Sequence, residues 1–292
     1  MNTQNETKKG LIYGLATFIM WGTFPIYFKF LQHIGSVEIL AHRIIWSFVI
    51  LIVLLRIKHK LSNLKILLKD KKLVFMLFLC GVLIATNWGI FIYAVMTDRI
   101  LQTSLGYFIN PLISILLAAI FLKEKLSLAA KFSVFLAFIA ICIQVISMGE
   151  LPLISIILPL SFAIYGLLHK KVSVPSLEGL FIETMLIFPI GMLYLTYLGI
   201  NHQGSFGFSL DGILLIISGL VTILPLLTFN SAALRLNLST VGYMQYISPT
   251  ISMLIAVFLY NEELGISKLI SFGLIWLGLF IVSFDSMKRK KQ

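Results

Sequence analysis

Five ionisable residues stand inside or beside long apolar stretches of the sequence, where a charge is costly and usually serves a function. They are Lys29, Glu38, His42, Arg43 and Glu183. A guanidinium such as that of Arg43 can orient an acidic or polar group of a bound molecule. A carboxylate such as that of Glu183 can serve a cation, a proton or a gate. The sequence therefore indicates binding or ion chemistry in an apolar environment.

Interfacial anchoring is the alternative for each of these residues, because a long side chain near the end of a membrane helix can reach back to water. Lys29 and Glu38 are equally compatible with anchoring and with function. Arg43 and Glu183 lie deeper in their stretches, which favours function. Glu38 and His42 are four residues apart and are expected to share one helix face.

A second set consists of uncharged polar and aromatic residues inside the apolar stretches. In lipid each polar group needs a partner, so these side chains are expected to face the interior of a helix bundle or a wet cavity. Helix–helix contact explains any one of them equally well, whereas a cavity wall with a few polar groups explains the set. Together the candidate residues for substrate binding or gating are Lys29, His42, Arg43, Asn87, Trp88, Tyr107, Asn110, Tyr165, Glu183, Asn230, Gln245 and Tyr246.

Sequence motifs for other kinds of chemistry are missing. No zinc-protease helix, phosphate-binding loop or ATP-binding signature occurs, so we expect neither an enzyme nor a cofactor, and the protein is driven either by a gradient or by no energy source at all. The 5 histidines fall in different segments, which disfavours a metal site. Cys80 and Cys142 both lie in apolar stretches and are expected to be small buried residues without a disulfide.

The stretches that carry these residues are long enough to cross a membrane. Of the 292 residues, 59% are hydrophobic and 12% are charged, whereas soluble domains are nearer half apolar and a quarter charged. Apolar runs of about 18 residues or more predict membrane-spanning helices. Ten spans are expected, at residues 11–28, 37–55, 73–97, 100–122, 132–149, 151–169, 184–210, 212–234, 236–261 and 266–284. The longest connection, a loop over 56–72, is too short for a soluble domain.

The positive charge is concentrated on one side of these predicted spans. The net charge is +11, and 19 of the 23 Lys and Arg residues fall in the termini and in every second connection, whereas the connection 199–212 has none. Basic residues mark cytoplasmic connections, so both termini are predicted to be cytoplasmic and the protein to lie in the cytoplasmic membrane. Attraction to anionic membrane lipids follows from the same charge, and nucleic acid is not an expected partner.

The two halves of the sequence resemble each other. Residues 109–126 match residues 247–264 at an offset of 138, and eight of 18 positions are identical. The identical positions include Pro111 with Pro249 and Glu124 with Glu262. Proline interrupts helical hydrogen bonding, so both copies are expected to bend there, either for packing or as hinges.

Two further matches extend this repeat. Residues 104–107 match 240–243 at an offset of 136, so the second copy has two extra residues before Pro249. Residues 36–38 match 176–178 at an offset of 140. The match predicts repeats over 1–149 and 150–292 with five spans each. Because five is odd, the second repeat enters the membrane from the opposite side, a plan common in secondary transporters.

These motifs resemble a known family. The sequence is similar to the RarD proteins, which belong to the EamA families of the drug/metabolite transporter superfamily. The stretches that carry the resemblance are 21–29, 38–43, 104–111, 183–184 and 245–250, and the likeness covers essentially the whole chain. The resemblance implies an all-α membrane protein, with ten transmembrane helices in two inverted five-helix repeats around a central cavity. It also implies export of small metabolites or drugs.

The leading interpretation is a secondary transporter or facilitator that exports a small amphipathic metabolite or drug, with a coupling proton or ion as a further partner. Uptake or exchange is the alternative within transport. A non-transporting membrane scaffold or an intramembrane enzyme is the alternative from another class, and solute flux in liposomes separates these classes. Arg43 and Glu183 are repeat-related and are expected to differ by about 10 Å in depth, without a direct salt bridge.

Overall fold

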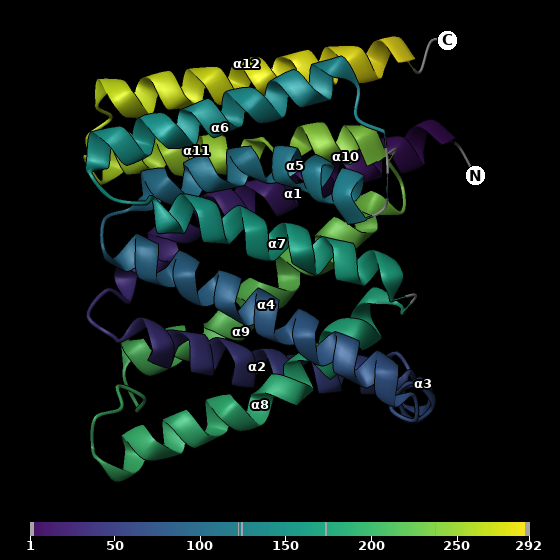
Figure 1. Cartoon of the computed structure of the whole chain (residues 1–292). Coiled ribbons are helices and arrows are strands. Elements are labelled where there is room, and N and C mark those ends of the chain that lie inside the picture. The colour runs from purple at the N-terminus through teal and green to yellow at the C-terminus, as the bar shows by residue number, and fades with distance from the viewer. Residues whose placement is uncertain (1–2, 122, 124, 173, 237, 290–292) are drawn as a thin grey trace.

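The structure is a computed structural model of the chain, and it describes residues 3–121, 123, 125–172, 174–236 and 238–289. Within these residues every regular element is a helix, as the all-α prediction requires. Figure 1 shows the long helices packed side by side with roughly parallel axes. The long helices are α1 (Thr3–Phe30), α2 (Ser36–Ile57), α4 (Lys71–Met96), α5 (Ile100–Phe121), α6 (Leu128–Met148), α7 (Leu153–Lys171), α8 (Ser176–Ile200), α9 (Leu210–Ala233) and α12 (Ile266–Arg289).

Four shorter elements complete the described fold. They are α3 (Leu61–Leu67), α10 (Leu238–Met244), α11 (Ile247–Leu254) and a π-helical turn, η1 (Ile255–Leu259). The helix α3 lies in the connection 56–72, which the sequence analysis takes to be a loop, and Leu64 packs inward from it. The connection is therefore partly helical.

Membrane crossing follows from the length and composition of the helices. Over the described residues, 9 segments are long and apolar enough to cross a membrane. The apolar part of α7, Leu153–His169, is shorter than these. The protein is therefore a multi-pass membrane protein.

Both termini lie at the same end of the bundle, on the right of Figure 1, together with α3. This end also carries the basic connection 56–72 and Arg235, and we call it the basic end. The connections that follow α1, α4 and α8 lie at the opposite end. A common end for the two termini is what an even number of crossings requires.

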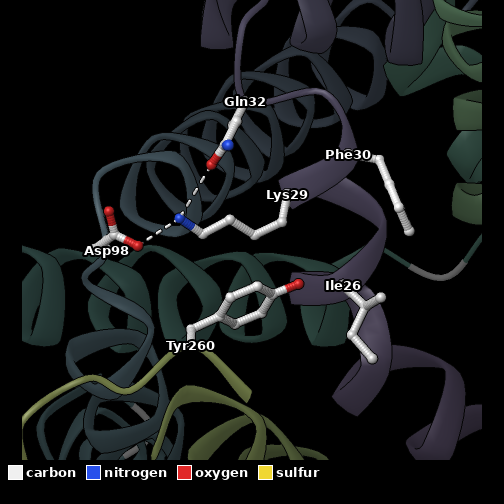
Figure 2. A pocket seen from close by; sticks show the side chains of 6 residues that line it. All are labelled: Ile26, Lys29, Phe30, Gln32, Asp98 and Tyr260. Atoms are coloured by element: carbon white, nitrogen blue, oxygen red, sulfur yellow. Dashed lines mark hydrogen bonds and ion pairs between the residues drawn. The ribbon is translucent and has the colours of Figure 1, made fainter.

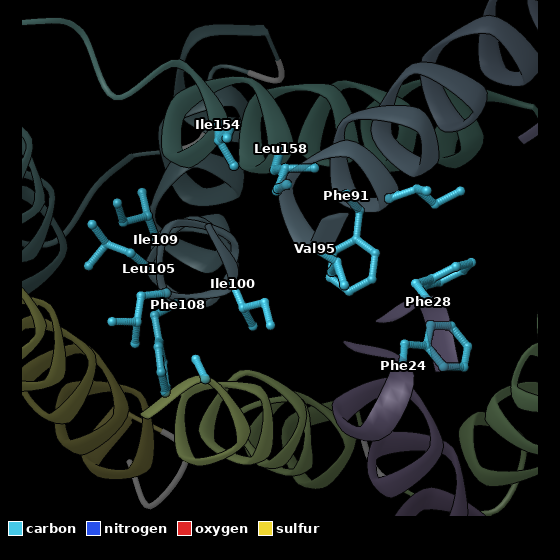
Figure 3. Packing of buried hydrophobic residues seen from close by; sticks show 14 of the residues in the cluster. Phe24, Phe28, Phe91, Val95, Ile100, Leu105, Phe108, Ile109, Ile154 and Leu158 are labelled. Atoms are coloured by element: carbon cyan, nitrogen blue, oxygen red, sulfur yellow. The ribbon is translucent and has the colours of Figure 1, made fainter. Parts of the chain in front are cut away.

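Aromatic and aliphatic side chains from α1, α4, α5 and α7 pack together between these helices. Figure 3 shows Phe24 and Phe28 of α1 near Phe91 of α4, with Leu158 of α7 on the other side of Phe91. The rings of Phe28 and Phe91 meet edge to face, with centroids 6.1 Å apart, a favoured aromatic geometry. In lipid such contacts stabilise by close packing and not by removal from water.

Small residues allow some helices to approach closely. A Cβ atom added to Gly219 of α9 would lie 2.6 Å from the carbonyl carbon of Trp46 in α2, and one added to Gly81 of α4 would lie 2.9 Å from the carbonyl oxygen of Glu183 in α8. Glycine at a helix interface is typical of membrane proteins, because it lets two backbones touch. These contacts set the positions of α2 and α8, which carry Arg43 and Glu183.

The predicted ninth span is broken. Gln245 and Tyr246 form a turn between α10 and α11, just before Pro249. Pro249 has no N–H to donate to the carbonyl four residues back, that of Gln245. The break also falls where the second repeat has its two extra residues. Pro111, by contrast, lies inside α5, which continues as one helix, so only the second copy is interrupted.

Candidate functional site

Arg43 of α2 is almost completely buried, with 3% of its surface exposed. Its Nε atom donates a hydrogen bond of 2.6 Å to the hydroxyl oxygen of Thr222 in α9. The Thr222 hydroxyl in turn donates to the carbonyl oxygen of Ser218. Among the described residues, the Nη1 atom of Arg43 is buried without a hydrogen-bond partner. The guanidinium therefore has donors to spare in a site closed to water.

Aromatic rings surround this guanidinium. Its Cζ atom lies 4.3 Å from the ring centre of Trp88, 5.6 Å from that of Phe28 and 5.8 Å from that of Phe24. A cation over an aromatic face within about 6 Å is attracted to it. In the part of the chain that the structure describes, no carboxylate pairs with Arg43. The rings thus partly compensate a buried charge that lacks a counter-ion.

Asn87 and Tyr107 lie beside the same site. The Asn87 side chain donates to the carbonyl oxygen of Leu158 at 2.8 Å and to the hydroxyl of Ser161 at 3.0 Å. It accepts a hydrogen bond of 3.1 Å from the hydroxyl of Tyr107, and Tyr107 is within electrostatic range of Arg43. The fold therefore brings four predicted residues together from three helices, and we call Arg43, Asn87, Trp88 and Tyr107 the guanidinium site.

Glu183 lies in a second polar cluster, nearer the basic end. Its carboxylate forms a short hydrogen bond with Nε2 of His169 and accepts one of 3.3 Å from the hydroxyl of Tyr165. The thiol of Cys80 lies beside them, and the donor atoms of Cys80, His169 and Glu183 are all within 4.8 Å of one another. Tyr165 and Glu183 of this cluster are among the candidate residues predicted from the sequence.

Arg43 and Glu183 are separated along the bundle, as expected. The helices α2 and α8 run antiparallel, because Ala41 approaches Gly191 while Phe48 stacks on Phe181. Glu183 is therefore about six residues, or about 9 Å, closer to the basic end than Arg43. The two residues have different partners and form no ion pair with each other. Within the described residues the two side chains therefore lie in separate clusters.

Lys29 lines a separate pocket at the end of the bundle opposite the basic end (Figure 2). Its Nζ atom lies 2.5 Å from a carboxylate oxygen of Asp98 and 3.4 Å from the amide oxygen of Gln32. The ammonium also faces the ring of Tyr260, 5.3 Å from its centre. The pocket has a volume of about 400 Å³. Lys29 thus joins α1 to the α4–α5 connection and does not belong to the guanidinium site.

His42 packs under the connection between α8 and α9. Its ring stacks on that of Phe206, with centroids 4.9 Å apart. Glu38, one turn earlier, accepts a hydrogen bond of 2.6 Å from the N–H of Ser205. The two residues share a helix face, as expected from their spacing, and both contact the connection between α8 and α9.

The four remaining predicted residues are spread over α5, α9 and the break in the ninth span. Asn110 is buried in α5, and its side-chain oxygen has no partner among the described residues. The ring of Tyr246 stacks on Phe108, with centroids 6.3 Å apart. Asn230 and Gln245 are half-buried. None of these four contacts Arg43 or Glu183 through a described hydrogen bond.

Several residues of both clusters could not be predicted from the sequence. Thr222 and Phe28 carry no distinguishing signal, because a threonine and a phenylalanine are ordinary in membrane helices. His169 lies at the end of the predicted span 151–169, and its position there predicts no functional site. Cys80 is expected to be a simple buried residue. Only the tertiary fold could place His169 and Cys80 beside Glu183.

Comparison with known proteins bears on the identity of the chain. A family model described as the EamA-like transporter family matches twice, over residues 8–146 and 151–284. Protein RarD of Escherichia coli is 41% identical over 290 residues, which cover 98% of each chain. The uncharacterized transporter YojE of Bacillus subtilis is 42% identical over 292 residues, which cover 98% of this chain and 97% of the relative.

A more distant relative and a solved structure agree with this likeness. The chloramphenicol-sensitive protein RarD of Pseudomonas aeruginosa is 25% identical over 284 residues, covering 96% of this chain and 95% of the relative. A crystal structure with 14% sequence identity matches 95% of this chain and 98% of its own, with a TM-score of 0.63, which supports the fold alone. The chain belongs to the EamA-like transporter family, and within it to the RarD proteins, so it is a membrane transporter and not an enzyme.

Proposed function

We propose that the protein is a secondary transporter or facilitator that exports a small amphipathic metabolite or drug carrying an anionic group. The observation that carries the proposal is the buried guanidinium of Arg43, which has no carboxylate partner in the described residues and an Nη1 atom without an acceptor. A buried unpaired charge is costly in a membrane protein and usually marks a substrate pathway. A carboxylate or phosphate of the substrate supplies the missing acceptor.

The surroundings of Arg43 suit an amphipathic molecule. A guanidinium presents five N–H donors in a planar fork that matches a carboxylate or phosphate. Trp88, Phe24 and Phe28 offer apolar faces around it, and Asn87 and Tyr107 supply polar contacts. A mostly apolar site with a few placed polar groups is the usual form of a small-molecule site.

The architecture that we propose is two inverted repeats of five helices, 1–149 and 150–292, with α7 as the sixth of ten spans around a central cavity. The double match of the family model supports this division. The helix contacts also correspond between the two proposed repeats. The contact of α4 with α7 corresponds to that of α9 with α1, and the contact of α5 with α7 corresponds to that of α11 with α1. The pairs α2–α8 and α6–α12 each join equivalent helices.

The remaining predicted residues take gating or lining roles in this proposal. Glu183 and Tyr165 form a gate towards the basic end, and Lys29 and His42 act at the opposite end. Asn110, Asn230, Gln245 and Tyr246 line the path between the repeats. Coupling to a cation or proton gradient is part of the proposal, since no ATP-binding signature occurs in the sequence.

We propose that the basic end is cytoplasmic and that the membrane is the cytoplasmic one. Basic connections stay on the cytoplasmic side. Asn63 and Gln203 are exposed at opposite ends of the bundle, and a single cysteine at either position is a suitable probe in a background without Cys80 and Cys142. An impermeant thiol reagent should label Gln203→Cys from outside cells and Asn63→Cys only after lysis. Labelling of both from one side would contradict the topology.

The experiment begins with metabolite profiling of cells and medium, with and without the gene, to find exported anions. The purified protein in liposomes is then assayed for flux of each candidate. We expect saturable flux that Arg43→Gln abolishes without loss of folded yield. Arg99→Gln changes an exposed arginine and serves as the matched control.

The possible outcomes separate the alternatives. Accumulation inside cells instead of outside indicates uptake, and flux that requires substrate on both sides indicates exchange. No flux of any tested solute by folded protein supports a scaffold. Flux by Arg43→Gln equal to that of the Arg99→Gln control overturns the proposed role of the guanidinium.

A further inference from the structure

Three side chains with metal-binding atoms converge where α4, α7 and α8 meet. They are Cys80, His169 and Glu183, whose donor atoms all lie within 4.8 Å of one another. Cys80 and Glu183 are buried at 0% and 1% exposure, and His169 is partly exposed. We propose that this cluster binds one divalent transition-metal ion of the zinc class, at a site separate from Arg43.

The donor set and its geometry both fit such an ion. Thiolate, imidazole and carboxylate groups are the ligands of zinc in proteins, and donors around a tetrahedral zinc ion are about 3.3–3.6 Å apart. The His169 ring nitrogen and the Glu183 oxygen, now in a short hydrogen bond, need to separate by only about 1 Å. The sulfur of Cys80 needs to approach by a similar amount, which side-chain rotation allows. Water or the hydroxyl of Tyr165, 3.3 Å from the other Glu183 oxygen, provides a fourth ligand.

Charge and ligand softness select the class of ion. Among the described residues, Glu183 pairs with no lysine or arginine. A divalent ion with one thiolate, one carboxylate and a neutral imidazole forms a site without net charge, which suits burial in a membrane protein. Calcium and magnesium prefer oxygen ligands only, whereas sulfur and imidazole favour zinc and its neighbours.

The cluster lies between helices of the two halves of the chain, so a bound ion would link the halves. Cys80 stands on α4 in the first half of the chain, and the other two ligands stand on α7 and α8 in the second half. A bound ion therefore fastens helices of the two halves to each other near the basic end. We expect zinc to raise the thermal stability of the protein and to slow any movement between these helices.

Cobalt(II) is the probe for this site, because a tetrahedral cobalt–thiolate centre gives strong visible bands and a near-ultraviolet charge-transfer band. The full chain, purified in detergent and stripped of metal, should show both with one equivalent of cobalt. Cys80→Ser and His169→Gln should lose the charge-transfer band and the tetrahedral bands respectively. Cys142→Ser and His202→Gln, which change the other cysteine and an exposed histidine, should keep both. No bands in the wild-type protein, or unchanged bands in Cys80→Ser, overturns the proposal.

X-ray absorption at the zinc edge tests the site without a disabling variant, in case Cys80→Ser does not fold. Zinc-loaded Cys142→Ser protein should show one sulfur neighbour at about 2.3 Å. A shell of nitrogen and oxygen alone contradicts the proposal. The outcome does not depend on the guanidinium site: Arg43→Gln should keep the cobalt bands even where its flux is lost, so the two proposals fail independently.

Discussion

Glu38 and Glu178 occupy the third positions of α2 and α8, and each holds a connection that lies in the other half of the chain. Glu38 accepts hydrogen bonds from the N–H and hydroxyl of Ser205 at 2.6 and 3.3 Å. Glu178 pairs with Lys60 at 3.3 Å. Both carboxylates are buried, at 4% and 1% exposure. Repeat-related glutamates thus hold connections at opposite ends of the bundle, Glu38 through hydrogen bonds from Ser205 and Glu178 through an ion pair with Lys60.

Replacing Glu38 with alanine should destabilise the protein. The variant loses two hydrogen bonds to a buried charged group and leaves the Ser205 N–H without its acceptor, which costs about 1.5–3 kcal/mol. The free energy of unfolding in detergent, from denaturant titration, is the measurement. Glu150→Ala changes an exposed glutamate and should cost less than about 0.5 kcal/mol. Equal losses for the two variants would contradict a specific role for Glu38.

Thr222→Val should weaken substrate binding while preserving the fold. Valine keeps the branched shape but removes the oxygen that accepts the hydrogen bond from Nε of Arg43. Loss of a hydrogen bond to a charged group is worth about 1.5–3 kcal/mol. The KM for flux should therefore rise about tenfold or more, with a smaller change in the maximal rate. In the control, Thr23→Val, the hydroxyl bonds only carbonyls of its own helix, and KM should stay constant.

The all-helical membrane fold and the shared face of Glu38 and His42 could be predicted because each depends on local composition or spacing, although the predicted span 184–210 is displaced from the observed α8, Ser176–Ile200. The cluster around Glu183 could not be predicted. Cys80, His169 and Glu183 are far apart in the sequence, and the repeat relates Glu183 to Arg43, a residue of opposite charge. Their meeting depends on how α4, α7 and α8 pack, which no local pattern contains.

The guanidinium site could likewise be predicted from the sequence only in part. The depth of Arg43 in its apolar stretch predicts a functional residue, and Trp88 belongs to the predicted set of uncharged polar and aromatic candidates. The partner that orients Arg43 is Thr222, 179 positions away, and it has no sequence signal of its own. Sequence patterns therefore identified the charged residue but not the contacts that hold it in place.

Gly219→Ala should reduce stability sharply, because its Cβ would lie 2.6 Å from the Trp46 carbonyl carbon, which belongs to the backbone and cannot rotate away. Overpacking of this kind costs about 1–3 kcal/mol or more. Gly273→Ala in α12 meets no atom within 4 Å and should be neutral or stabilising by up to about 1 kcal/mol. The melting temperatures of the two variants, measured by thermal unfolding, test this difference. Similar melting temperatures would mean that α2 and α9 are not in close contact.

Glu262 should give the stability a pH dependence. It accepts hydrogen bonds from the N–H groups of Ile100 and Leu101 at 2.6 and 2.9 Å, and burial raises its pKa despite these donors. A raised pKa means that the folded state holds the proton more tightly than the unfolded state. The contribution of Glu262 to the free energy of unfolding therefore falls as pH rises from its ordinary pKa of about 4.3 through the raised value.

Glu262→Gln removes this titration and tests it. The variant should gain stability relative to the wild-type protein as the pH rises above about 4.3, the ordinary pKa of the carboxyl group, as measured by unfolding at several pH values. Glu263→Gln, which changes the exposed neighbouring carboxylate, is the matched control. A variant whose stability runs parallel to that of the wild-type protein across this range would rule out the raised pKa. Glu124, the repeat-related residue, lies outside the described residues.

Pro111→Ala and Pro249→Ala should have unequal effects, although the two prolines are repeat-related. In α5 the helix continues through Pro111, so an alanine there donates its new N–H to the carbonyl of Tyr107 four residues back. Replacing proline in a continuous helix is favourable by up to about 3 kcal/mol. The equivalent acceptor for residue 249 is Gln245, which lies in the turn between α10 and α11, outside any helix.

The two extra residues explain why Pro249→Ala should not close this break. A helix made continuous through Gln245 and Tyr246 would change the rotation of α10 relative to α11, whereas Ser252 of α11 is fixed by the hydrogen bond of 3.0 Å that it donates to the Gly22 carbonyl oxygen. The break keeps α11 in register with α1. We therefore expect the melting temperature to rise more in Pro111→Ala than in Pro249→Ala, with Gln245 remaining in a turn. An equal or larger rise in Pro249→Ala would show that the proline, and not the insertion, causes the break.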